Sequence, residues 1–443
     1  MNNKFSPRKK SPDILTMILA GGRGSRLATL TKWRVKPAVP FGGNYRIIDF
    51  VLSNCINSGL NNIGVLTQYK SQSLIRHLLN GWNFLNDGLE GFLEIIPAQM
   101  RNKNEWYEGT ADSIYQNIDL IQKFAPENIM ILGGDHIYKL DYNRFISFHT
   151  ERQADVTVGC IEVSTKEAQS LGIMTTDPNQ KITGFVEKPV HPVTVPGNKS
   201  RCLASMGIYI FKTERLLKLL MQDAVDGQST HDFGRDIIPA ALNTSRIFAW
   251  PFVDELSGTP EYWKDIGNID SYWQANMDLL SPAPRLDLND QSWPIKSILK
   301  NRPPTILHID NDHSKKIIHS MISAGCIING CSSENSIVSD GVKMQNSRIR
   351  NSVILPDAVI GSGCRIQNTI IDKNTVIPDG LVIGENSEED SRYFHISPGG
   401  IRLISQDMVQ DYVSKKQTSK PVRILHSKMH HQLYPLLKDQ YVS

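Results

Sequence analysis

The sequence has 443 residues, of which 40% are hydrophobic and 21% charged, so we expect a soluble protein with two or three domains. The net charge of +3 and the lack of a basic stripe with interleaved aromatic residues argue against a nucleic-acid partner. No apolar stretch is long enough for a signal peptide or a membrane span. We therefore expect no membrane partner. The six cysteines are sparse and form no CxxC pair, so we expect reduced thiols and a cytoplasmic protein.

The first part of the chain alternates short apolar runs with helix-like stretches. A polar, basic extension covers residues 1–13. Apolar runs then follow at 14–20, 63–67, 129–132 and 156–160. Strands that alternate with helices predict an α/β domain with a mostly parallel sheet, which we place at residues 14–280.

The second part has a different pattern. Proline density and the loss of periodicity predict a linker at 281–316. Over 317–407 aliphatic residues recur every six positions, with glycine and asparagine between them, which predicts a parallel β-helix, although a run of ordinary short strands is the alternative. We assign no fold to the basic tail, 408–443.

A glycine-rich loop follows the first strand directly. Gly21, Gly22 and Gly24 lack side chains, which lets backbone N–H groups approach the phosphates of a nucleotide. The loop is neither a Walker motif nor a GxGxxG motif, and alone it could be an ordinary turn. Arg23 and Lys36 make the nucleotide interpretation stronger, because both could neutralise the charge on a departing pyrophosphate.

Two aspartates are candidate magnesium ligands. Asp135 follows the strand at 129–132, and α/β sheets bind ligands at the carboxyl ends of their strands. Its alternative role is a helix N-cap. Asp265 could supply a second carboxylate, and a Mg²⁺ ion between these groups and the phosphates would organise an in-line displacement.

A Glu-Lys pair ends a further predicted strand. Lys188 could bind a sugar phosphate and Glu187 could accept a hydrogen bond from a sugar hydroxyl, although a surface ion pair is the alternative. His136 and His231 are interpreted as structural, because a phosphate-oxygen nucleophile is already ionised at pH 7 and needs no general base.

These motifs, in this order, resemble the nucleotidyltransferase signature, and longer stretches resemble glucose-1-phosphate adenylyltransferases. The stretches are 36–43, 46–50, 52–59, 106–112, 204–209 and 231–239. The resemblance implies a Rossmann-like catalytic domain, a left-handed β-helix, a homotetramer and a need for Mg²⁺. It also implies a reaction in which ATP and α-D-glucose 1-phosphate give ADP-glucose and pyrophosphate for glycogen synthesis.

The resemblance also implies roles for individual residues. It makes Asp135 catalytic and metal-binding, with Asp265 as its partner. The glucose 1-phosphate site consists of Tyr107, Gly172, Glu187, Lys188 and Ser205. The nucleotide site consists of Gly21, Gly22, Gly24, Gln99, Gly109 and Asp112.

The sequence differs from the family where effectors bind. Trp33 stands where regulated members often carry a basic residue, and Pro40 stands where some have histidine. Arg34 and Arg46 remain as candidate regulatory residues. We therefore expect weak activation by a sugar bisphosphate, while inhibition by a monophosphate such as AMP remains open.

Two other functions fit parts of the sequence. The chain could be a non-catalytic regulatory subunit, although such a subunit would be expected to lose Arg23, Lys36, Asp135 or Lys188. The β-helix could also be an acyltransferase, but this activity typically uses a histidine in or beside the coils, and the sequence has none between His319 and His395.

Overall fold

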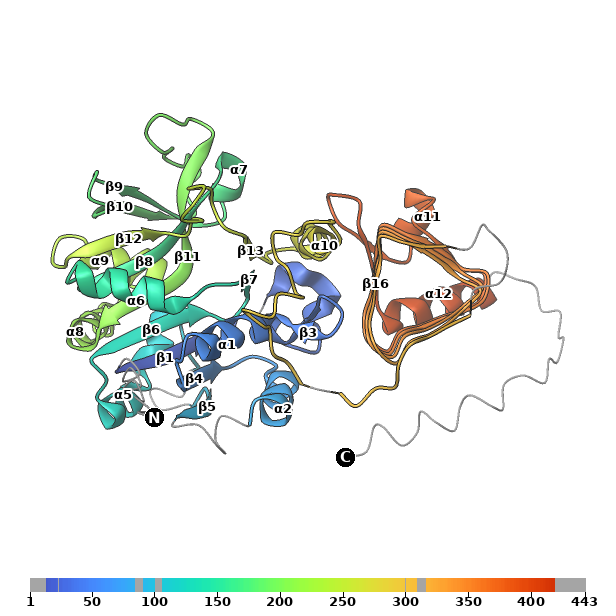
Figure 1. Cartoon of the computed structure of the whole chain (residues 1–443), viewed down its shortest axis with the longest axis horizontal. Coiled ribbons are helices and arrows are strands. Elements are labelled where there is room, and N and C mark those ends of the chain that lie inside the picture. Colours follow the sequence, from blue (N-terminus) through green and yellow to red (C-terminus); the bar gives the residue numbers. More distant parts are fainter. Residues whose placement is uncertain are drawn as a thin grey trace, which may run out of the picture.

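The computed structural model describes residues 13–22, 24–83, 91–99, 106–298, 300–308 and 316–418. No helix within these ranges is both long and apolar enough to cross a membrane. Figure 1 shows an α/β domain beside a coil of strands with a triangular cross-section. An extended segment joins the two.

The α/β domain is built on a nine-stranded sheet with the path β10-β9-β11-β6-β1-β4-β5, and β8 and β12 continue beside β11. Its strands are β1 Ile14–Leu19, β4 Asn62–Thr67, β5 Phe92–Pro97, β6 Asn128–Gly133, β8 Val156–Ser164, β9 Gly172–Thr176, β10 Ile182–Glu187, β11 Arg201–Lys212 and β12 Ile247–Pro251. The strands from β6 to β5 are parallel, whereas β11 is antiparallel to β6, β8 and β9. The expectation of a mostly parallel sheet therefore holds only for one half of the sheet. The long strand β11 lies in the middle of the sheet and runs antiparallel to its neighbours.

The domain also contains helices and two small two-stranded sheets. The helices are α1 Ile47–Asn57, α2 Gln72–Gly81, α4 Thr110–Tyr115, α5 Ile118–Phe124, α6 Tyr142–Glu151, α7 Thr165–Ala168, α8 Thr213–Asp223, α9 Ile238–Ala241 and α10 Ile269–Asp278. Shorter helical segments are η1 Ser25–Thr31, η2 Lys36–Ala38 and η3 Phe233–Ile237. Of the small strands, β2 Pro40–Phe41 pairs with β3 Tyr45–Arg46, and β7 His136–Tyr138 pairs with β13 Trp263–Asp265. The pairing of β7 with β13 matters for function, because it places Asp265 opposite His136, next to Asp135.

The second domain is a parallel β-helix with three faces, as the six-residue period predicts. One face contains β14 Ile306–His308, β17 Ile327–Asn329, β20 Lys343–Gln345, β23 Val359–Ile360 and β26 Val376–Ile377. The next contains β15 Ile317–Ile318, β18 Ser332–Glu334, β21 Arg348–Arg350, β24 Arg365–Gln367 and β27 Val382–Ile383. The third contains β16 Met321–Ile322, β19 Ile337–Val338, β22 Val353–Ile354, β25 Thr369–Ile371, β29 Arg402–Ile404 and β28 His395–Ile396.

The domain limits differ from the expected ones at two places. β14 lies inside the expected linker, yet it pairs with β17, so the β-helix begins earlier than position 317. The expected tail begins inside α12 Gln406–Thr418, whose apolar residues pack against the core of the β-helix. The other helix in the described part of this domain is α11 Ser387–Ser391. Figure 1 shows α11 and α12 beside the triangular coil.

The two domains share a hydrophobic core. Phe41 and Tyr272 of the α/β domain belong to one buried cluster with Val353 and Leu403 of the β-helix. Figure 1 shows α10 between the α/β sheet and the face of the β-helix that contains β16. The shared cluster fixes the position of the β-helix beside the segment that follows the glycine loop.

Candidate active site

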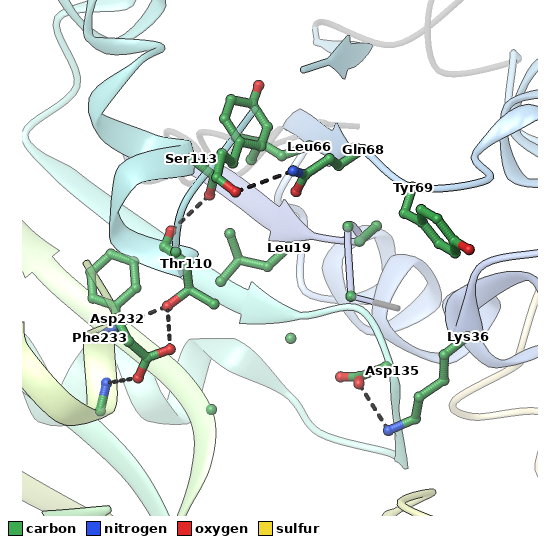
Figure 2. A pocket seen from close by; sticks show the side chains of 18 of the residues that line it. Leu19, Lys36, Leu66, Gln68, Tyr69, Thr110, Ser113, Asp135, Asp232 and Phe233 are labelled. Atoms are coloured by element: carbon green, nitrogen blue, oxygen red, sulfur yellow. Dashed lines mark hydrogen bonds and ion pairs between the residues drawn. The ribbon is translucent and has the colours of Figure 1, made fainter. Parts of the chain in front are cut away.

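The cleft at the carboxyl ends of β1, β4 and β6 has a volume of about 1080 Å³. Figure 2 shows side chains from both walls pointing into it. Gly21, Gly22 and Gly24 line one wall together with Lys36 and Asp135. Carboxyl ends of neighbouring parallel strands meet at one edge of a sheet, which is why loops far apart in sequence converge here.

The glycine loop requires glycine at position 24 for two reasons. Gly24 has a φ of +58°, in the left-handed region that favours glycine, and a Cβ at this position would lie 2.9 Å from Cβ of Lys36. A side chain here would displace Lys36. Arg23, which the sequence makes a phosphate-binding residue, lies outside the described residues, so its role stays a prediction.

Lys36 forms the centre of the site. Its buried ammonium lies 2.8 Å from a carboxylate oxygen of Asp135 and 2.8 Å from one of Asp265. Burial alone would lower the pKa of Lys36, but the two carboxylates outweigh it and raise the pKa above its ordinary value. Figure 2 shows the ion pair between Lys36 and Asp135.

Asp135 is held in its ionised form. Burial raises the pKa of its carboxyl, but the charges of Lys36 and His136 outweigh this effect and lower the pKa to about 2. Carboxylate oxygens of Asp135 and Asp265 and a ring nitrogen of His136 all lie within 4.8 Å of one another. This group of ligand atoms could hold a cation, so His136 lies closer to the predicted chemistry than its structural interpretation suggested.

The opposite wall contains the predicted sugar-phosphate residues. Glu187 and Lys188 line the cleft and form an ion pair with each other. Gly172 does not line the cleft; instead, a Cβ at this position would lie 2.5 Å from the Phe185 ring and 2.7 Å from the Glu187 carboxylate. Gly172 therefore makes room for both side chains. Ser205 is buried and accepts a hydrogen bond from the backbone N–H of Gly207 at 3.2 Å.

A loop from Trp106 to Gly109 closes one end of the cleft. Tyr107 lines the cleft, and its hydroxyl accepts a hydrogen bond from Asn117 at 3.0 Å. Gly109 lies so close to the backbone that an added Cβ would be 2.1 Å from the carbonyl oxygen of His231. Asp112 does not line the cleft. It accepts a hydrogen bond from the N–H of Glu108 at 3.0 Å and so stabilises the loop.

Gln99 and the three candidate regulatory residues lie away from the cleft lining. Gln99 is exposed just after β5. Trp33 is 72% exposed, whereas Arg34 is buried and its guanidinium binds Asp372 of the β-helix. Arg46 donates a hydrogen bond to the carbonyl of Ser73 at 2.8 Å.

The sequence interpretation missed several residues that line the cleft. They are Gln68, Tyr69, Lys70, Trp106, Thr110, Tyr209, Asp232 and Arg235. Gln68 donates a hydrogen bond to the carbonyl of Tyr107 at 3.1 Å, and Thr110 donates one to Asp232 at 3.0 Å (Figure 2). The residues after β4 could have been found, because they follow a strand that pairs in parallel with β1.

The fold and the cleft define a nucleotidyltransferase followed by a hexapeptide β-helix. Residues 15–282 match the family model described as "Nucleotidyl transferase", and residues 302–404 match "GlmU-like, C-terminal hexapeptide". The second match agrees with the predicted left-handed coil.

Curated relatives identify the family more narrowly. Glucose-1-phosphate adenylyltransferase 2 of Alkalilimnicola ehrlichii is 48% identical over 92% of this chain and 98% of that protein. The glucose-1-phosphate adenylyltransferase of Methylococcus capsulatus is 50% identical, over 89% of this chain and 93% of that protein. That of Nitrosococcus oceani is 46% identical, over 92% and 98%. The chain belongs to the glucose-1-phosphate adenylyltransferase family.

Proposed function

We propose that this protein transfers AMP from ATP to α-D-glucose 1-phosphate, giving ADP-glucose and pyrophosphate for glycogen synthesis. The observation that carries the proposal is the position of Lys36. Its ammonium bridges Asp135 and Asp265 beside the glycine loop, across the cleft from Glu187 and Lys188. Membership of the family supplies the adenine and glucose specificity, which the geometry of the cleft alone does not fix.

The reaction needs no covalent intermediate. A phosphate oxygen of glucose 1-phosphate attacks the α-phosphorus of ATP, the new P–O bond forms, and the bond from that phosphorus to the β-phosphate oxygen breaks. The electron pair leaves with pyrophosphate, and no proton must move because the attacking oxygen is already ionised. The protein contributes position and charge neutralisation. Lys36 and Arg23 stabilise the leaving pyrophosphate, and Lys188 holds the attacking phosphate.

A magnesium ion fits the ligand atoms present. Mg²⁺ prefers oxygen ligands and is commonly held by one or two carboxylates together with substrate phosphates. Asp135 and Asp265 provide two such carboxylates, and the Lys36 ammonium between them shows that their oxygens converge on a cation. When bound, Mg²⁺ would neutralise charge on the phosphate oxygens. Lys36 would then be free to reach the phosphates.

The sugar phosphate is assigned to the wall formed by β9, β10 and β11. Lys188 supplies an ammonium for the phosphate, and Glu187 supplies a carboxylate for sugar hydroxyls. Ser205 orients the turn at Gly207, which lines the cleft, and Tyr107 covers the end of the site. Gly21, Gly22, Gly24 and Gly109 are assigned to the nucleotide, with Gln99 and Asp112 as neighbouring residues.

A substrate panel tests this function. We expect pyrophosphate release only when ATP and glucose 1-phosphate are both present with Mg²⁺, in reactions that pair each nucleoside triphosphate with each of several sugar 1-phosphates. Mass spectrometry should find ADP-glucose. Pyrophosphate release by the chain purified alone also excludes a non-catalytic regulatory subunit. Faster turnover with another triphosphate or sugar phosphate would contradict the assigned specificity.

A cationic cluster at the domain boundary supports binding of a regulatory anion. Burial is the main cause that lowers the pKa of Lys373 to about 8; the charges of Arg34 and Arg46 lower it further, while Asp372 opposes the shift. We propose that a monophosphate such as AMP binds here as an inhibitor. Trp33 adds no charge, so we expect little change in kcat/KM when fructose 1,6-bisphosphate is added.

We further propose a cytoplasmic homotetramer. Exposed apolar side chains on the outer side of the β14 face support association: Ile306, Ile327 and Val376 are 48%, 37% and 44% exposed. They lie in one register with Val359, and the exposed Lys343 stands between Ile327 and Val359 in the same register. All six cysteines are buried free thiols, as expected in a reducing compartment.

A further inference from the structure

Lys70 lies beside the glycine loop but is not part of any motif that the sequence interpretation used. It follows β4, which pairs in parallel with β1, and the N–H of Ala20 donates a hydrogen bond to the carbonyl of Leu66 at 2.9 Å. The loops after β1 and β4 are therefore neighbours. Lys70 lines the cleft with Gly21 and Gly24, on the wall opposite Lys188.

When a triphosphate is bound, the negative charges in this half of the cleft outnumber the positive charges assigned to it above, those of Lys36, Arg23 and Mg²⁺. The single ammonium of Lys36 faces two carboxylates, Asp135 and Asp265, so these three groups together carry a net negative charge. A triphosphate adds several more negative charges. The other lysine and arginine side chains that line the described part of the cleft, Lys188 and Arg235, come from β10 and η3 on the sugar side.

The Lys70 ammonium has a partner that a phosphate could readily replace. It donates a hydrogen bond to the backbone carbonyl of Lys32 and lies 4.7 Å from the centre of the Tyr69 ring. Among the described residues no carboxylate forms an ion pair with it. A hydrogen bond between two charged groups is stronger than one between an ammonium and a neutral carbonyl.

The backbone at Lys70 supports a role in binding. Its φ is +44°, in the left-handed region that lysine rarely adopts. Strained residues of this kind persist where the surrounding structure holds them and are frequent at ligand sites. Lys188, the residue assigned to the sugar phosphate, has the same property with a φ of +49°.

We infer that Lys70 binds the β- and γ-phosphates of ATP, and therefore also the pyrophosphate product. The ammonium leaves the Lys32 carbonyl and contacts the phosphate oxygens when the nucleotide enters. No bond forms or breaks at Lys70 and no proton is transferred. This inference rests on the proposed function, because it requires the triphosphate to lie beside the glycine loop.

Substitution of Lys70 tests the inference through affinity. In Lys70→Gln the dissociation constants of ATP and of pyrophosphate, measured by calorimetry with Mg²⁺, should rise about 10- to 100-fold, as expected for the loss of a charged hydrogen bond. KM for glucose 1-phosphate and the affinity for adenosine should stay within about threefold. Lys70→Arg should restore most of the phosphate affinity, since a structural requirement for lysine would not be met by arginine.

A matched control and a reference variant separate the outcomes. Lys166→Gln changes an exposed lysine on α7, away from the cleft lining, and should leave all four constants unchanged. Lys36→Gln reports on the proposed position of the triphosphate. If Lys36→Gln weakens pyrophosphate binding and Lys70→Gln does not, the inference about Lys70 is wrong while the proposed function stands. If neither variant weakens it, the position of the triphosphate itself is wrong. An equal loss for adenosine and pyrophosphate in Lys70→Gln would also overturn the inference, because it would indicate a distorted loop.

Discussion

At the scale of single residues, the active site contains opposite charges that already form ion pairs in the absence of substrate: Lys36 pairs with Asp135 and Asp265. Asp135 stays ionised because Lys36 and His136 lower its pKa to about 2, against the effect of burial. The carboxylate is therefore ionised at neutral pH, which is the form that can bind a metal. Lys36 in turn is kept charged by Asp135 and Asp265.

Asp135→Asn tests the metal-binding role. The amide preserves the shape of the side chain but removes its charge, so we expect kcat to fall at least about 100-fold, as for the loss of a preorganised charge-stabilising group. The measurement is initial rate at saturating Mg²⁺, with glucose 1-phosphate binding and thermal unfolding as controls for folding. Near-normal turnover would refute the assignment of Asp135.

Lys188→Ala tests the sugar-phosphate site. The ammonium is assigned to the phosphate of glucose 1-phosphate, so its removal should raise KM for this substrate far more than KM for ATP. An increase of about tenfold or more is expected for one charged hydrogen bond. Equal increases for both substrates would mean that Lys188 does not belong to the sugar side of the cleft.

The residues at the ends of parallel strands could be found from the sequence, because their position depends on local pattern and on a general property of α/β sheets. Gly21, Lys36 and Asp135 are examples, and all three line the cleft. Asp232 could not be found in this way. It reaches the cleft from a turn before η3, and only the tertiary structure brings it within hydrogen-bond distance of Thr110.

At the scale of elements, the sequence predicted the β-helix well, whereas the expectation of a mostly parallel sheet did not foresee the antiparallel strand β11. A six-residue period is a local signal that repeats along the chain, so errors at single positions do not matter. The antiparallel pairing of β11 with β6 depends on a long-range contact that no local pattern specifies. The start of the β-helix was missed because β14 is a single short strand in a proline-rich segment, and only its long-range pairing with β17 identifies it as part of the β-helix.

The turn that follows β25, which contains Lys373, also has a pH-dependent property. Burial, Arg34 and Arg46 destabilise the charged form of Lys373 and lower its pKa to about 8. Below pH 8 the ammonium is charged and can bind an anion; as the pH rises through 8 it loses its charge. We therefore expect the affinity for AMP to fall by up to tenfold per pH unit above pH 8, with proton uptake on binding.

Calorimetry at pH 7 and pH 9 checks this expectation. Lys373→Arg provides the control, because a guanidinium remains charged at pH 9 and should largely remove the pH dependence between these values. AMP affinity that is equal at both pH values in the native chain would show that Lys373 does not take part in binding.

At the scale of the whole molecule, a buried ion pair between Arg34 and Asp372 joins the two domains across 338 positions of sequence. Arg34 and Asp372 are both largely buried, with 4% and 11% of their side chains exposed. Arg34 also donates a hydrogen bond to the carbonyl of Leu30 at 2.7 Å. The regulatory interpretation of Arg34 therefore has to include this structural role.

Asp372→Asn should destabilise the protein because it leaves the Arg34 charge buried without its counter-charge. A loss of about 3–5 kcal/mol is typical for breaking a buried ion pair. Chemical denaturation measures the effect, and the double variant Arg34→Met with Asp372→Leu should recover much of the loss, since it buries no charge. A double variant that is as unstable as Asp372→Asn would show that packing, and not the unpaired charge, is responsible.

The hydrophobic cluster shared by α10 and the β16 face limits how this protein could be rebuilt. Phe41, Tyr272, Val353 and Leu403 are buried in one cluster to which both domains contribute. Neither domain can therefore be exchanged for its counterpart in another protein without changing this cluster. A chimera that joined this α/β domain to the β-helix of a distant relative would face a mismatched surface unless both sides of the cluster were exchanged together. Engineers who cut and recombine such chains should place their junctions away from this contact.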